Sequence, residues 1–249
     1  MKRFINLLLV FSIFIMCTAV PALALDDTNS YSFKDLDLLF DKISEQQTRM
    51  DAALTMEESA RTLGFKDTHE VIKLAQKEYQ KAYNLCSRYQ EIYNNLIAQQ
   101  EEKWLEKERE YPYATYIWRY FKELGYSDAV CAGIMGNLMS EVGGSTLHIK
   151  YWATNSNRYY GMCQWSKSYF DVWGKSLKEQ CDYLAKTIKY EFDTFGYAYK
   201  KGFNYEAFLS LTNEKDAALA FAKCYERCAS GGYGRRQRNA TKAYNYFVD

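Results

Sequence analysis

One glutamate continues the apolar stripe of an expected helix. Ser127 is a good N-terminal cap for a helix over residues 128–141. The apolar stripe of this helix consists of Val130, Ile134 and Leu138. Glu141 takes the next position on that face, and two glycines, Gly143 and Gly144, then end the helix. Partial burial and the negative end of the helix dipole both favour the neutral form of a carboxyl group there. Glu141 is therefore a candidate general acid, and the alternative is a surface glutamate at a helix end.

Aromatic rings are concentrated in the segment that follows Glu141. The rings are Tyr151, Trp152, Tyr159, Tyr160, Trp165, Tyr169 and Trp173, and they alternate with Asn155, Asn157 and Gln164. Flat rings beside amides and hydroxyls can stack on pyranose rings and bond to their substituents. We expect a sugar-binding groove in which Gln164 and Trp165 are the preferred contacts, while several of the other rings belong to the core.

Blocks of the sequence around Glu141 resemble one known family. They cover residues 133–141 (GIMGNLMSE), 160–166 (YGMCQWS) and 220–227 (AFAKCYER), followed by Arg236 and Ala240. Together they resemble the phage tail lysozyme family, a branch of the lysozyme-like peptidoglycan hydrolases, over about residues 113–247. The resemblance implies a compact, mainly helical domain around a groove for glycan strands, with Glu141 as the catalytic acid. The substrate-binding candidates are Tyr160, Gly161, Gln164, Trp165 and Tyr225.

The implied reaction is cleavage of the β-1,4 bond between N-acetylmuramic acid (MurNAc) and N-acetylglucosamine (GlcNAc). Residues 142–170 contain no Asp or Glu, so a second carboxylate must come from Asp171, Glu191 or Glu226, or is not used. Without one, the 6-hydroxyl of the substrate attacks C1 and leaves a 1,6-anhydro end. This lytic transglycosylase outcome is slightly favoured over hydrolysis by a lysozyme (muramidase). Glu226, expected inside a helix beside Arg227, is interpreted as a structural partner, with a second catalytic carboxylate as the alternative.

The composition contains few of the residues and motifs that metal-dependent or nucleotide-dependent chemistry needs. The 249 residues contain His69 and His148 as the only histidines, no CxxC or HExxH motif and no Gly-rich phosphate loop. We therefore expect no metal and no cofactor.

A Gly-rich basic turn over residues 230–238 contains Arg235, Arg236 and Arg238. It is interpreted as a solvated loop, or as a surface that meets the carboxylates of an anionic wall polymer. Nucleic acid is not expected as a partner.

The first residues are typical of an export signal. Lys2 and Arg3 precede an apolar run over residues 4–20, and residues 22–24 (ALA) form a small-x-small cleavage motif. We predict cleavage after Ala24, a secreted or cell-wall location, and no stable membrane span in the mature chain.

Signal removal also takes Cys17 away. The remaining cysteines are Cys86, Cys131, Cys163, Cys181, Cys224 and Cys228. An even number in an exported chain predicts disulfides, with the pairing left open. Cys224 and Cys228, four residues apart on one expected helix, are not expected to pair with each other.

Two regions of opposite charge meet near Pro112. Residues 25–110 contain 12 Lys and Arg against 18 Asp and Glu, while the chain from Tyr111 onward contains 18 against 13. The acidic region is expected to form two helices joined at a turn near Gly64, as a helical hairpin or short coiled coil. We interpret this hairpin as a spacer. The alternative is a stalk that binds an envelope partner or forms a homodimer, with Cys86 available to link two copies.

The predicted fold is mainly α, with room for a short β segment. It consists of a signal peptide (1–24), a helical hairpin or coiled-coil stalk (25–111) and a lysozyme-like catalytic domain (112–249). Gly133 and Gly136 inside the expected helix indicate close packing of another backbone. Two other functions stay open: a non-catalytic wall-binding module, and an envelope-assembly component that acts through the hairpin.

Overall fold

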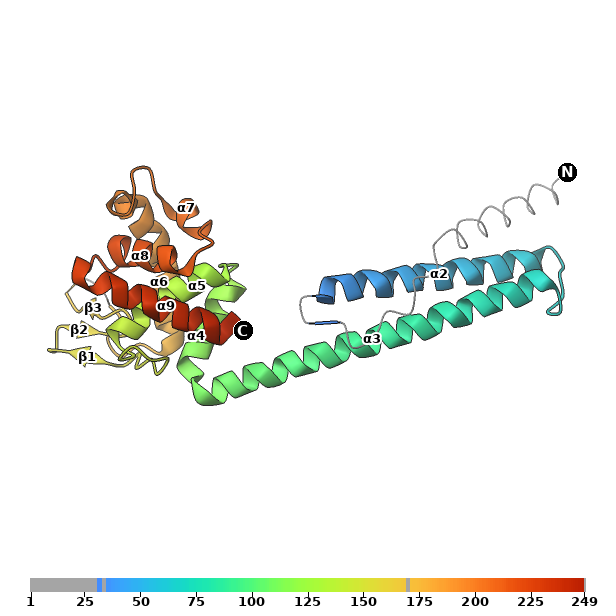
Figure 1. Ribbon diagram of the computed structural model, residues 1–249, viewed down its shortest axis with the longest axis horizontal. Coiled ribbons are helices and arrows are strands. Elements are labelled where there is room, and N and C mark those ends of the chain that lie inside the picture. Colours follow the sequence, from blue (N-terminus) through green and yellow to red (C-terminus); the bar gives the residue numbers. More distant parts are fainter. Residues whose placement is uncertain (1–30, 33–34, 169–170, 249) are drawn as a thin grey trace. The chain divides into compact units, whose positions relative to one another are not determined.

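The computed structural model describes residues 31–32, 35–168 and 171–248 (Figure 1). The predicted signal peptide, Cys17 and Tyr169 lie outside these described residues. The chain divides into two compact units, residues 1–103 and 104–249. In the part of the chain that the structure describes, no helix combines the length and apolar character needed to cross a membrane.

The first unit is a pair of helices. Helix α2 (Leu36–Thr62) and most of α3 (Glu70–Glu110) lie side by side in Figure 1. Leu39 and Ile43 of α2 pack with Tyr89 of α3. Gly64 in the turn has a φ of +86°, a backbone conformation that glycine adopts without strain. The predicted helical hairpin is confirmed, and its coiled-coil form stays a prediction.

The second unit is built mainly from helices. They are α4 (Pro112–Glu123), α5 (Asp128–Glu141), α6 (Leu177–Phe195), α7 (Tyr205–Leu209), α8 (Glu214–Cys224) and α9 (Tyr233–Val248). A small antiparallel sheet of order β1-β2-β3 consists of Thr154–Asn155, Tyr159–Tyr160 and Trp165–Ser166. Tyr160 pairs with Trp165 in this sheet. The mainly α fold class with a short β segment is therefore confirmed.

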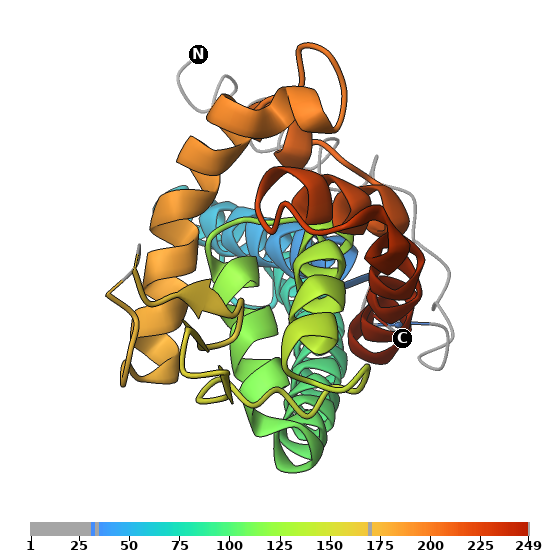
Figure 2. The same ribbon diagram turned by 90° about the vertical axis from the view of Figure 1, so that its left-hand side faces the viewer.

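Helix α5 lies between α4 and α9, as Figure 2 shows, and also packs against α8. Ser127 caps it by accepting a hydrogen bond from the backbone N–H of Val130. A Cβ atom on Gly133 would lie 2.5 Å from Cβ of Ala217 in α8, and one on Gly136 would lie 2.5 Å from the carbonyl oxygen of Arg236 in α9. The predicted close packing at both glycines is confirmed, because a larger side chain would push the neighbouring helix away.

Helix α8 ends earlier than the sequence suggested. Its last residue is Cys224, so the prediction that Glu226 and Cys228 lie within a helix is wrong. Arg227 has a φ of +49°, which a right-handed helix does not allow, and the N–H of Cys228 turns back to the carbonyl of Ala222. The chain then enters α9 at Tyr233, so the expected basic loop over residues 230–238 is largely helical.

The six cysteines of the described residues carry free thiols. No disulfide joins the six cysteines within the described residues, so the predicted disulfides are absent there. The buried thiols have separate surroundings instead: Sγ of Cys131 donates to the carbonyl of Tyr126, and Sγ of Cys224 donates to that of Gly196. Each acts as a small apolar side chain with a weak hydrogen bond.

Candidate active site

Glu141 is the last residue of α5. Its side chain is 21% exposed, and it follows the fully buried Leu138 on the same helix. The helix stops there because Gly143 and Gly144 follow closely, with Gly144 at a φ of +58°. The carboxyl group is therefore anchored by the core and still open to a ligand on one side.

Arg236 of α9 is the direct partner of Glu141. Its Nη2 donates to Oε1 of Glu141 in an ion pair, and its side chain is only 5% exposed. The close approach of α9 to Gly136 places Arg236 at this point, because its own carbonyl oxygen lies against that glycine. Nε of Arg236 is buried and has no hydrogen-bond partner among the described residues. Hydrogen bonds between a guanidinium and a carboxylate are charge-assisted and stronger than neutral ones.

Glu226 adds a second carboxyl group to the same cluster. Its Oε1 is buried and has no hydrogen-bond partner in the described part of the chain. Burial raises the pKa of Glu226 to about 8, the negative charge of Glu141 raises it further, and Arg236 partly opposes this. The carboxyl group of Glu141 is paired with Arg236, while burial favours the neutral form of Glu226. The charges of Glu141 and Arg236 both act on Glu226.

Two thiols border this cluster without being activated by it. Burial, followed by the charges of Glu226 and Glu141, raises the pKa of the Cys163 thiol well above its usual value. Burial also raises the pKa of Cys228, which Arg236 partly offsets. Only a thiolate is a good nucleophile, so neither cysteine is suited to nucleophilic catalysis near neutral pH.

Most of the predicted groove residues are buried. Trp165 is 4% exposed, and its Nε1 donates to the hydroxyl of Tyr225 at 3.1 Å. Tyr225 is 7% exposed, and its hydroxyl lies 2.9 Å from Oγ1 of Thr187 in α6. Tyr160 is buried as well and packs against Trp173, with 4.8 Å between ring centroids. In this structure Trp165 and Tyr225 connect β3 to α6 and to the end of α8, and the three rings leave little surface for a sugar.

Gly161 and Gln164 shape the turn between β2 and β3. Gly161 is buried at a φ of +85°, and a Cβ atom there would lie 2.6 Å from Oε1 of Gln180. The amide of Gln164 donates to the carbonyls of Ala153 at 3.0 Å and Gly161 at 2.9 Å. Its nitrogen is therefore already bonded to the protein, and the amide oxygen is the atom left for a ligand.

Other rings of the same segment do reach the surface. Trp152, Tyr159 and Trp173 are 47%, 41% and 39% exposed. Nζ of Lys167 lies 4.5 Å from the ring centre of Trp173, so a cation covers part of that ring. Trp152 is thus the most exposed ring of the segment among its described residues.

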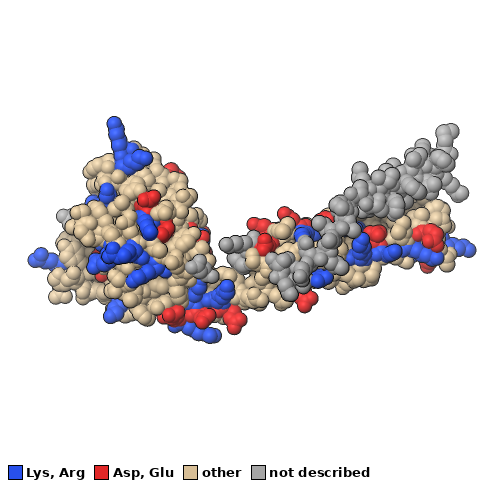
Figure 3. All heavy atoms as spheres, viewed as in Figure 1, with Lys and Arg blue, Asp and Glu red and all other residues tan. Residues whose placement is uncertain are grey.

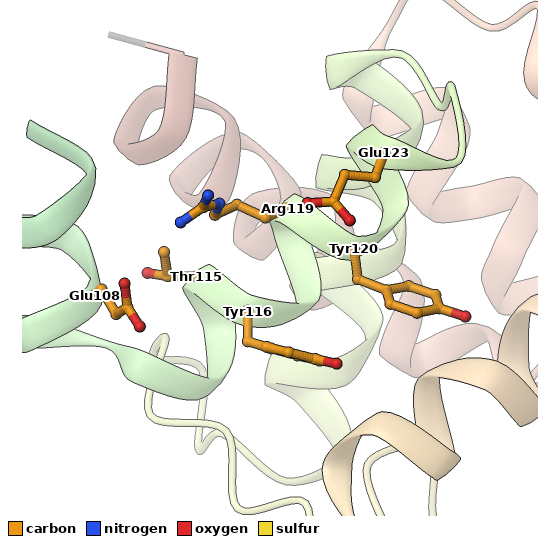
Figure 4. Close-up of a pocket in the computed structure, with 6 residues that line it drawn as sticks. All are labelled: Glu108, Thr115, Tyr116, Arg119, Tyr120 and Glu123. Carbon is orange, nitrogen blue, oxygen red and sulfur yellow. The ribbon is translucent and has the colours of Figure 1, made fainter. Parts of the chain in front are cut away.

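Two cavities of the second unit lie away from Glu141. One of about 250 Å³ lies on α4 and is lined by Glu108, Thr115, Tyr116, Arg119, Tyr120 and Glu123. In Figure 4 the side chain of Arg119 points toward Glu108 and Thr115, away from the rings of Tyr116 and Tyr120. The other, of about 270 Å³, is lined by Tyr111, Pro112, Tyr113, Leu147, His148, Ile149, Lys150 and Trp152. The sequence analysis identified neither cavity, since their walls combine α3, α4 and a distant loop.

Lys and Arg side chains are prominent on the face of the second unit seen in Figure 3. Among the described residues, no group of three or more His, Cys, Asp or Glu side chains is arranged to hold a metal ion.

The sequence gave no sign that Arg236 pairs with Glu141, because the two residues meet only when α9 packs on α5.

Residues 112–247 match the family model described as phage tail lysozyme. Comparisons with curated proteins and with solved structures gave no match. The matched residues include Glu141, Glu226 and Arg236, so the whole charged cluster lies within them.

Proposed function

The chain belongs to the phage tail lysozyme family, which indicates a peptidoglycan-cleaving enzyme, and we propose the bond and the residue involved. The enzyme cleaves the β-1,4 bond between MurNAc and GlcNAc, with Glu141 as the general acid. The observation that carries this proposal is the cluster in which Glu141, at the open end of α5, interacts with Arg236 and Glu226. Two carboxyl groups in different environments, one partly exposed beside a cation and one buried with a raised pKa, are typical of acid–base catalysis on glycosides.

Glu141 is the carboxyl group that reaches the substrate. Its side chain is partly exposed, whereas Oε1 of Glu226 is buried. In the protonated state Glu141 donates its proton to the glycosidic oxygen while the bond from that oxygen to C1 breaks. The resulting carboxylate is stabilised by Arg236 and then accepts a proton from the group that attacks C1.

The attacking group is the 6-hydroxyl of MurNAc. Of the remote carboxylates considered from the sequence, Asp171 is exposed and Glu191 is paired with Arg227. Glu226 interacts with Glu141, but its raised pKa keeps it neutral near pH 7, and a neutral carboxyl group is a poor base and nucleophile. Attack by the 6-hydroxyl gives a 1,6-anhydro end, so the reaction is that of a lytic transglycosylase, with lysozyme-type hydrolysis as the alternative.

Analysis of the products tests this reaction. Purified peptidoglycan is digested with the full chain, and the released muropeptides are separated and weighed by mass spectrometry. We expect 1,6-anhydro ends, which are lighter than reducing ends by one water. A digest with reducing ends alone contradicts the transglycosylase route and supports hydrolysis, while intact glycan strands contradict cleavage altogether.

The exposed and buried tryptophans are expected to respond differently to substitution. Trp152→Ala should weaken binding to glycan fragments several-fold, up to about tenfold, through the loss of a stacking surface. Trp165→Phe should lower the free energy of unfolding by about 1–2 kcal/mol, because it removes the hydrogen bond to Tyr225 inside the core. Binding titrations and denaturant unfolding of both variants separate the effects. If only Trp165→Phe lost affinity, Trp165 and not Trp152 would be the ring that contacts the glycan.

We also propose where the enzyme acts. Its substrate lies in the cell wall, which agrees with the export signal expected over residues 1–24 and with the positive balance of the chain from Tyr111 onward. The helical pair of α2 and α3 then serves as a spacer.

A further inference from the structure

One cavity of the second unit includes the exposed ring of Trp152. It lies between the start of α4 and the loop that precedes β1, and we call it the Trp152 pocket. Its volume of about 270 Å³ is slightly below the range of about 300–1,000 Å³ for drug-sized ligands, so it suits one sugar ring. Leu147 and Ile149 of its lining are buried, whereas the rings of Tyr113 and Trp152 are exposed. The pocket therefore offers a ligand both an apolar surface and the faces of aromatic rings.

The rings around the pocket hold one another in place. Trp152 packs edge-to-face against Tyr113, with 5.4 Å between ring centroids, and against Tyr151 at 5.0 Å. Tyr113 and Tyr151 also contact each other, at 5.2 Å. A second ring contact joins Tyr111 to the imidazole of His148 at 4.7 Å. Rings fixed in this way lose little freedom when a ligand binds, so the binding surface exists before the ligand arrives.

The charge of the pocket favours an anionic ligand. Within the described residues its lining contains His148 and Lys150 as basic residues and no Asp or Glu. Lys150 is exposed and forms no ion pair with another described residue, so its ammonium group is available to a ligand. An ammonium group and a carboxylate form charge-assisted hydrogen bonds. The pocket thus combines a stacking surface with a cation, which together match a sugar that carries a carboxylate.

The Trp152 pocket is separate from the Glu141 site. Tyr111 of the pocket packs against Tyr246 of α9, with 5.2 Å between ring centroids. Arg236, the partner of Glu141, lies three helical turns earlier on α9. Because an α-helix rises about 1.5 Å per residue, this separation is about 15 Å along the helix. A sugar at Glu141 therefore leaves the pocket free for another part of the same strand.

We propose that the Trp152 pocket is an accessory site for a sugar that carries a carboxylate, with the sugar ring on Trp152 and the carboxylate at Lys150. This inference rests on the proposed peptidoglycan substrate. In peptidoglycan the carboxylate is that of the lactyl group of MurNAc or, where a stem peptide is attached to that group, a carboxylate of the peptide. A second contact with the same polymer raises the effective concentration of the strand at the first site. The pocket would therefore keep a strand bound between cleavage events.

The indole N–H signal of Trp152 reports binding at this pocket. We record proton–nitrogen correlation spectra of the isotope-labelled full chain, in which the signal of Trp152 is the one that Trp152→Phe lacks. The titrant is the disaccharide GlcNAc–MurNAc, which contains no MurNAc–GlcNAc bond and is therefore not cleaved. We expect the Trp152 signal to shift and saturate, while the signal of Trp118, which is buried in the core, stays in place. A Trp152 signal that does not respond to the disaccharide overturns the proposal.

Two other probes identify the recognised carboxylate. GlcNAc–GlcNAc carries none, so its Kd at the Trp152 signal should be about two- to fivefold higher, the effect of an exposed ion pair. GlcNAc–MurNAc linked to the dipeptide alanyl-glutamate carries its carboxylates on the peptide. Whichever acidic probe binds more tightly than GlcNAc–GlcNAc contains the carboxylate that the pocket recognises. Equal Kd values for all three probes would contradict recognition of a carboxylate and overturn the proposal.

Substitution of Lys150 tests the position of the cation. Lys150→Gln should raise the Kd of the acidic probe to that of GlcNAc–GlcNAc and remove the decrease in affinity that added salt causes in the wild type. Lys186→Gln is the matched control, because Lys186 is an exposed lysine of α6 outside the pocket lining, and it should bind like the wild type. If Lys150→Gln keeps the wild-type Kd and salt dependence, the assignment of the carboxylate to Lys150 is overturned.

Substitution of Tyr113 tests the ring wall. Tyr113→Ala should raise the Kd of the acidic and neutral probes alike by several-fold, because it removes one ring of the wall and a support of Trp152. Tyr116→Ala, at an exposed tyrosine one turn later on α4 that lines the other cavity, should leave every Kd unchanged. Equal affinities in these two variants would contradict the ring wall as the binding surface.

The binding experiments and the digest of peptidoglycan have independent outcomes. If the Trp152 signal responds as expected but glycan strands stay intact, the accessory site is supported and the proposed cleavage is wrong. If muropeptides are released but the Trp152 signal does not respond, the proposed cleavage stands and the accessory site is overturned.

Discussion

Glu141→Gln is expected to lower the turnover of purified peptidoglycan at least about a hundredfold, the scale of general acid catalysis. Glutamine has nearly the same size and can still accept a hydrogen bond from Arg236 through its amide oxygen, but it cannot donate a proton as an acid. The fold and the affinity for glycan strands should remain close to those of the wild type. Release of soluble muropeptides gives the turnover, and circular dichroism with thermal unfolding verifies the fold.

Glu123→Gln is the matched control for this experiment. Glu123 is the last residue of α4, as Glu141 is of α5, but it is exposed and lies on the wall of the cavity in Figure 4. Its substitution should leave the turnover near that of the wild type. If folded Glu141→Gln clears the wall as fast as this control, Glu141 is not the acid.

Local signals in the sequence predicted the helix that carries Glu141. Ser127 caps it, the stripe through Leu138 is buried, and a pair of glycines ends it. These features depend on residues a few positions apart, so periodicity and capping preferences reveal them. The close packing at Gly133 and Gly136 was also predictable, since a glycine inside a helix is costly unless a neighbour needs the space.

The features missed by the sequence analysis depend on tertiary packing. Composition does not distinguish Trp165, whose ring lies in the core, from Trp152, which is 47% exposed, because both occur among polar residues. The end of α8 depends on the backbone of Arg227, which is not a residue type that favours a positive φ. The pairing of Arg236 with Glu141 spans 95 positions and required α9 to be a helix at that point.

The same packing gives Arg236 a role in stability. Arg236→Met keeps an unbranched side chain of similar length and removes the cation that pairs with Glu141. We expect the free energy of unfolding to fall by about 3 kcal/mol at pH 7, the lower end for a broken buried ion pair, because Glu141 is 21% exposed. Equilibrium unfolding in urea at pH 7 and pH 9 gives the free energies.

The loss should be smaller at pH 7 than at pH 9. Arg236 partly lowers the raised pKa of Glu226, so its removal raises that pKa further. A group whose pKa is raised in the folded state contributes stability that is lost as the pH rises through that pKa, so the variant continues to lose stability above about pH 8, where the wild type no longer does. Arg235→Met is the control, because Arg235 is the exposed neighbour on α9 and should change the stability little at either pH. Equal destabilisation of Arg236→Met at both pH values would mean that Arg236 acts through packing alone, and the electrostatic account of the cluster would then be wrong.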